Sequence, residues 1–120
     1  MTFDVLLDQV LSDAPRFGHR EHVHLTWLAV RAHGVAGATE LVSDGIQRMA
    51  PQQHHRTITQ AWVELVGFHV ADEADFDTFL SHHPALLDKR LLLRFYQSAT
   101  LASTAARHGW IGPDKEPFPT

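Results

Sequence analysis

The sequence predicts an all-α protein, a compact single-domain bundle of five to seven helices with an irregular C-terminal tail. Two observations predict this class. Apolar residues recur with the helical period almost everywhere, as in the stripe formed by Phe3, Leu6, Leu7 and Val10. No segment shows the alternation expected of a half-buried strand. A length of 120 residues fits one domain, which we take to span residues 1–120.

The first half of the chain predicts three helices, over residues 3–13, 19–33 and 38–50. Pro15 follows the first and would stop it. Gly34 follows the second and suits the position after a helix C-terminus. The third has an apolar face that includes Val42 and Ile46, and Pro51 lies just beyond it.

The second half predicts four more helices, over residues 54–70, 73–82, 85–96 and 98–108. Asp72 and Ser98 can act as N-caps for the second and fourth of these, and Pro84 precedes the leucine-rich third. Gly109 follows the last helix. The tail over residues 109–120 contains three prolines, which predicts that it is not helical.

Composition and charge narrow the classes of function. The formal net charge is −4, so the strong positive field that holds a nucleic acid is missing, and we expect no nucleic-acid partner. The absence of cysteine excludes thiolate ligands and disulfides. No apolar run approaches about 18 residues, and the N-terminus lacks the basic start of a signal peptide. We therefore expect a cytoplasmic protein with no membrane contact; a homodimer is left open.

The unusual feature is histidine, which occurs ten times. Helical projection, at about 100° per residue, places His19 and His22 on one inward stripe at the first turn of the second helix. The same projection turns His24 toward solvent and Glu21 to the opposite side. His55 lies at the first turn of the fourth predicted helix, on its core face. Two buried helices would thus present histidines at their N-terminal turns.

If those helix ends meet, His19, His22 and His55 form a metal site. Three imidazoles can bind a divalent transition metal such as Zn, Fe, Cu or Ni. The predicted function is a metal-dependent enzyme acting on a small-molecule substrate, by metal-assisted hydrolysis or lyase chemistry or by oxygenase-type chemistry. Glu21, Thr59 or Tyr96 would support the metal or act as acid/base groups. The chain contains no nucleotide-binding fingerprint, so the sequence does not predict an organic cofactor.

Two alternatives remain open on the residues alone. The first is a metal-free enzyme on a small molecule, with His22 or His55 as general acid/base. The second is a non-catalytic module for ligand binding or dimerisation, whose histidines are core hydrogen-bond partners.

The chain also resembles a family of small, mostly uncharacterised bacterial proteins. Members pair a Phe-x-His-x-(Asp/Glu)-His segment with a Tyr-His-Glu-Thr-(Ile/Val)-Thr segment and end in a leucine- and tyrosine-containing region. The matches here are Phe17, His19, Glu21, His22 and Val23, then His55, Thr57, Ile58 and Thr59, then Leu86, Leu87, Tyr96, Leu101, Ser103, Ala106, Arg107, Pro113 and Asp114.

The chain departs from that family pattern at two places. Arg56 stands where the family has glutamate, and Phe95 precedes Tyr96 where the family has two tyrosines. The resemblance implies that His19, His22 and His55 are the marked positions. It implies no reaction type.

Overall fold

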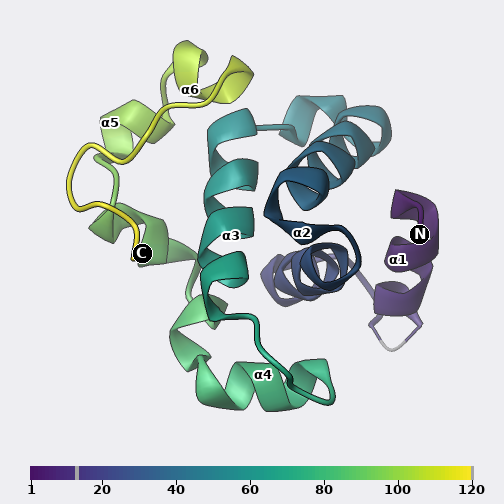
Figure 1. Cartoon of the computed structure of the whole chain (residues 1–120). Helices are drawn as coiled ribbons and strands as arrows, with labels where there is room; N and C mark the ends of the chain where they lie inside the picture. The colour runs from purple at the N-terminus through teal and green to yellow at the C-terminus, as the bar shows by residue number, and fades with distance from the viewer. Residues whose placement is uncertain (13, 120) are drawn as a thin grey trace.

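The computed structural model describes residues 1–12 and 14–119, and it is all-α, as the sequence predicts (Figure 1). No strand occurs in this described part of the chain. Its α-helices are α1 (Phe3–Leu11), α2 (His19–Met49), α3 (Arg56–His69), α4 (Phe76–His82), α5 (Ser98–Leu101) and α6 (Thr104–His108). Three 3-10 helices complete it: η1 (Pro51–Gln53), η2 (Pro84–Leu87) and η3 (Lys89–Arg94). None of the helices in these ranges is long and apolar enough to cross a membrane.

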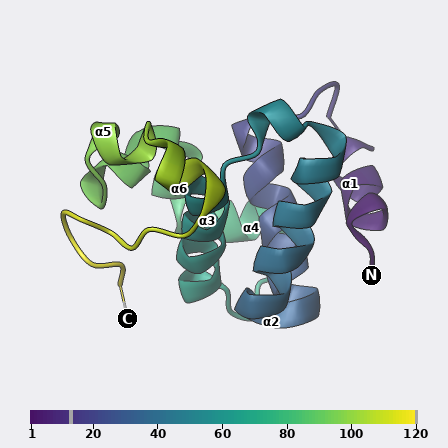
Figure 2. The same ribbon diagram turned by 90° about the horizontal axis from the view of Figure 1, so that it is seen from above.

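Helix α2 is sharply kinked at Gly34. This residue has φ 74° and ψ 176°, a backbone conformation that is essentially restricted to glycine. The two halves of α2 replace the helices predicted over residues 19–33 and 38–50. Figure 2 shows the two halves lying beside each other, with α1 on their outer side. The kink therefore returns the end of α2 to the region where α2 begins.

Helix α3 runs through the middle of the molecule, between α2 on one side and the C-terminal segments on the other (Figures 1 and 2). One hydrophobic cluster joins α2, α3, α4, η2 and η3, and includes Trp27, Trp62, Phe79 and Tyr96. A second cluster joins α1, both halves of α2, and Val63 of α3. Because α3 contributes to both clusters, its orientation is fixed from two sides.

Several predicted helices begin later or are broken. The predicted helix 73–82 begins at Phe76, because Asp75 rather than Asp72 is the N-cap, accepting from the Thr78 amide at 2.8 Å. The predicted helix 85–96 is η2 followed by η3, interrupted at Asp88, whose carboxylate accepts from the Arg90 amide. The predicted helix 98–108 is α5 followed by α6, which is capped by Ser103. The predicted end of the first helix at residue 13 lies outside the described residues.

The C-terminal tail is non-helical and is held against the bundle by hydrogen bonds. Thr57 Oγ1 donates to the Gly109 carbonyl at 2.6 Å and accepts from the Ile111 amide at 3.0 Å. The Tyr96 hydroxyl donates to the Ile111 carbonyl at 2.6 Å. Asp114 accepts from the Gln97 amide at 2.9 Å and from the Thr100 hydroxyl. Thr57 and Tyr96 thus supply hydrogen-bond partners to backbone groups of the tail, which has no secondary structure of its own.

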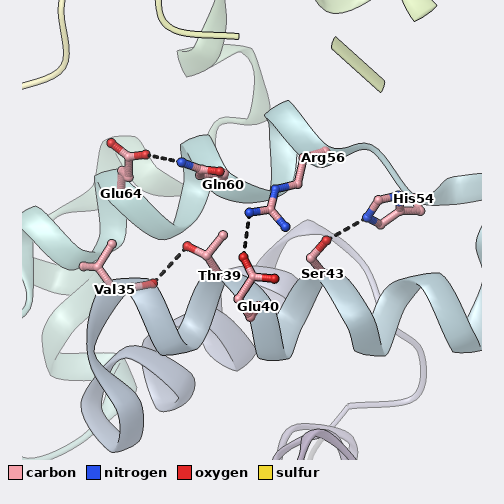
Figure 3. Close-up of polar contacts among 8 residues, drawn as sticks. All are labelled: Val35, Thr39, Glu40, Ser43, His54, Arg56, Gln60 and Glu64. Carbon is pink, nitrogen blue, oxygen red and sulfur yellow. Dashed lines mark hydrogen bonds and ion pairs between the residues drawn. The ribbon is translucent and has the colours of Figure 1, made fainter. Parts of the chain in front are cut away.

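A polar seam joins the second half of α2 to the start of α3 (Figure 3). Arg56 makes an ion pair with Glu40 at 2.7 Å, and Ser43 Oγ lies 2.8 Å from His54 Nε2. The position at which the resembling family has glutamate therefore holds an arginine that contacts a carboxylate on α2. Arg56 is directed into this seam.

Candidate functional site

A cavity of about 580 Å³ is lined by three histidines, His19, His22 and His55. Several segments, far apart in the sequence, form its wall. The beginning of α2 contributes His19 and His22, the end of α2 contributes Ile46 and Met49, α3 contributes residues 58, 59 and 62, and η3 contributes residues 89, 90, 92 and 93. The kink at Gly34 makes this arrangement possible, because it brings both ends of one helix to the same pocket.

His55 has both ring nitrogens in hydrogen bonds. It is the N-cap of α3 and lies outside the helix, where its Nδ1 accepts from the Ile58 amide at 3.0 Å. Nδ1 must then be unprotonated, so Nε2 carries the hydrogen and donates to the Leu101 carbonyl at 2.7 Å. In this arrangement the neutral ring has no lone pair left for a metal ion.

His19 has one ring nitrogen in a hydrogen bond. Its Nε2–H donates to the Leu86 carbonyl at 2.9 Å, because a carbonyl oxygen can only accept. Its ring lies 4.7 Å from the Trp62 ring, measured between centroids, with an interplanar angle of 60°. These contacts fix the imidazole plane and leave Nδ1 as the available acceptor.

His22 differs from the other two histidines. None of the described residues forms a hydrogen bond with either of its ring nitrogens. Neither nitrogen is fully buried. The Phe17 ring packs edge-on against it at 6.2 Å. Burial, and then the positive charge that His19 can carry, lower the pKa of His22 from 6.5 to about 4. At neutral pH this ring is an uncharged imidazole that faces the cavity.

Four of the residues predicted from the sequence therefore line one pocket: His19, His22, His55 and Thr59. The other two do not. Glu21 accepts a hydrogen bond from the Gly18 amide at 2.9 Å and so closes the first turn of α2. Tyr96 is fully buried; burial, and then the carboxylates of Glu64 and Asp114, raise its pKa, and its hydroxyl holds the tail.

Sequence reasoning did not find the apolar and basic part of the wall. Met49, Lys89, Arg90 and Leu93 all line the pocket. The sequence predicts residues 89–93 to lie on an α-helix, whereas they lie on η3, which begins after Asp88. The available signal was the Lys89–Arg90 pair, two adjacent charges inside a leucine-rich segment.

The helical projection was wrong for His24. His24 is half-buried rather than exposed, and its ring stacks on Phe76 with centroids 4.2 Å apart and an interplanar angle of 4°. Projection gives the angle of a side chain around its helix. It does not give the neighbours, and Phe76 of α4 here covers the His24 ring.

In the described ranges, no group of three or more histidine or acidic side chains could hold a metal ion. Of the three pocket histidines, His19 and His22 each have a ring-nitrogen lone pair available in this conformation. The arrangement can bind a molecule against apolar walls and offer it the neutral His22 ring as donor and acceptor. Comparison with known proteins gives no match to a family model, to a curated protein or to a solved structure.

Proposed function

We propose that this protein binds a small, mainly apolar molecule in the histidine pocket, and that His22 is the polar group that the molecule contacts. The observation that carries the proposal is the contrast among the three histidines. His19 and His55 are fixed by backbone carbonyls, whereas His22 has no hydrogen-bond partner among the described residues and borders the cavity. Concave apolar sites with a few polar groups are the usual form of ligand pockets.

A second candidate is metal-free catalysis with His22 as general base. The same observation favours it, because a base must have an unoccupied nitrogen that the substrate can reach. A pKa of about 4 makes the ring a weak base in the free protein. An anionic substrate beside it would raise that pKa and strengthen the base.

The metal-dependent enzyme that the sequence predicts stays a prediction. It would need His55 to give up either its cap on α3 or its bond to Leu101. His19 is oriented as metal-bound histidines usually are, with its other nitrogen on a backbone carbonyl. Zn²⁺ titration of wild type, His22→Asn and His55→Asn separates the hypotheses: tight, stoichiometric binding lost in both variants would support the metal site over our proposal.

The direct test is a ligand-observed NMR screen of a small-molecule library. It compares wild type with Ala50→Trp, which places a bulky ring in the pocket wall, and with Ala50→Ser as the matched small change. We expect a set of ligands that bind wild type and Ala50→Ser, bind Ala50→Trp at least about tenfold more weakly, and shift the His22 ring resonances. Equal binding to all three proteins, or no ligand at all, would sink the proposal.

His22→Asn gives an independent check. It keeps a polar group at this position but changes its reach and geometry. We expect weaker binding of those same ligands, while His108→Asn, an exposed histidine outside the pocket, leaves binding unchanged.

A further inference from the structure

The charge of the pocket wall says more about the ligand. Apart from the histidines, the charged residues of the wall are Lys89 and Arg90, both on η3. No carboxylate occurs among the described residues that line the cavity. Most of the remaining wall is apolar and includes Ile46, Ile58, Trp62 and Leu92. A wall of this kind fits a molecule with an apolar body and a negative group.

The two cations differ in their availability. Arg90 makes two bonds to Asp88, from Nε to Oδ1 at 3.1 Å and from Nη2 to Oδ2 at 3.2 Å, so its charge is largely matched within η3 and its cap. The Lys89 ammonium has no hydrogen bond or ion pair with any described residue. Lys89 is exposed, so its charge stays hydrated until a ligand arrives.

One unmatched ammonium suits a monoanion. Phosphate monoesters, which carry close to two negative charges, are typically held by several donors and above all by the fork of an arginine. Here the arginine fork is occupied by Asp88. A carboxylate carries a single negative charge, which one ammonium can match.

We propose that the ligand is an amphiphilic monocarboxylate, with its carboxylate paired to Lys89 and its apolar part lying against Ile58 and Trp62. This inference rests on the proposed function, since it names the class of molecule that the pocket takes. The cavity volume of about 580 Å³ accommodates such a molecule.

The experiment measures dissociation constants by NMR titration for four probes with the same alkyl chain: octanoate, octyl phosphate, 1-octanol and octylamine. The proteins are wild type, Lys89→Gln and Lys115→Gln. Lys115 is the matched control, because it is the other lysine of the chain and does not line the pocket. Its ammonium donates to the backbone carbonyl of the wall residue Leu93 at 2.8 Å, so its charge is already engaged. Both substitutions remove one positive charge.

We expect octanoate to bind wild type more tightly than the other three probes. Lys89→Gln should weaken octanoate binding by about three- to tenfold and leave 1-octanol unchanged, while Lys115→Gln should change neither. Raising the salt from about 20 mM to about 300 mM should weaken octanoate binding only where Lys89 is present.

Failure of this inference differs from failure of the proposed function. If the probes bind wild type with similar affinity, compete with one another and are insensitive to Lys89→Gln, the pocket binds small molecules but not by their charge, and the inference is overturned. The same conclusion follows if octyl phosphate binds best, or if Lys115→Gln weakens octanoate as much as Lys89→Gln does. If no probe binds wild type more tightly than Ala50→Trp, both ideas fail.

Discussion

His55 and Leu101 are joined by a hydrogen bond of 2.7 Å, from the imidazole Nε2–H to the carbonyl oxygen, across 46 positions of sequence. The same ring caps α3 through Nδ1. His55 therefore holds the start of α3 to the end of α5, and both residues lie on the wall of the pocket. This histidine positions the site through both nitrogens.

We expect His55→Ala to lower the free energy of unfolding by about 2–3 kcal/mol, because it removes a helix cap and leaves two backbone groups without partners. His55→Asn should cost less, since asparagine is a good N-cap but cannot reach Leu101 in the same way. Urea denaturation measures both, with His108→Asn as the exposed control. Equal losses for His55→Ala and His108→Asn would contradict this role.

Replacement of Thr57 should loosen the C-terminal tail. Thr57→Val keeps the shape of the buried side chain but removes the hydroxyl that bonds both Gly109 and Ile111. We expect a loss of about 1–3 kcal/mol and faster amide hydrogen exchange over residues 109–114. Thr39→Val is the matched control, because Thr39 is also buried but bonds only the Val35 carbonyl of its own helix (Figure 3). Faster exchange of the tail in Thr39→Val as well would argue against a specific bridge.

The kink in α2 should depend on glycine. Gly34→Ala meets no steric contact within 4 Å, yet it places a Cβ in a backbone region that side chains avoid. We expect a loss of about 1–3 kcal/mol in the free energy of unfolding and weaker ligand binding, because the kink brings Ile46 and His22 to one pocket. Denaturation and the octanoate titration measure the two effects. A stabilised Gly34→Ala protein would contradict the strained geometry.

The low pKa of His22 predicts a dependence of stability on pH. The folded protein binds this proton only near pH 4, whereas the unfolded chain binds it near 6.5. Between these values the unfolded chain holds more protons, so the free energy of unfolding falls as the pH falls. Allowing for the partial exposure of the ring, the loss is on the order of 2 kcal/mol between pH 7 and pH 4.

His22→Gln isolates this effect, because its side chain stays uncharged over the whole range. We expect wild type to lose stability relative to His22→Gln as the pH falls from 7 to 4, while His108→Asn follows wild type. Imidazole NMR titration should place the His22 midpoint near 4. A midpoint near 6.5 would show that the ring is well hydrated.

The sequence by itself determined the fold class and named four of the residues that line the pocket, His19, His22, His55 and Thr59. Apolar positions with the helical period predict helices. Gly34 correctly marked an interruption of helical geometry, although it is a kink with φ 74° within α2 and not the end of a separate helix. The inward stripe correctly placed His19 and His22 together, because residues three apart on one helix face the same way whatever surrounds them.

Tertiary structure alone decided what each of these residues does. The Leu101 carbonyl occupies one ring nitrogen of His55 that a metal ion would need. The Ile111 carbonyl accepts from the Tyr96 hydroxyl, which therefore holds the tail and does not face the pocket. Lys89 lies on η3, which begins after Asp88 in place of a continuous helix, and only the folded chain brings η3 and α3 to the same pocket. Such partners lie far along the chain, and helical periodicity describes only the residues within a few turns of one another.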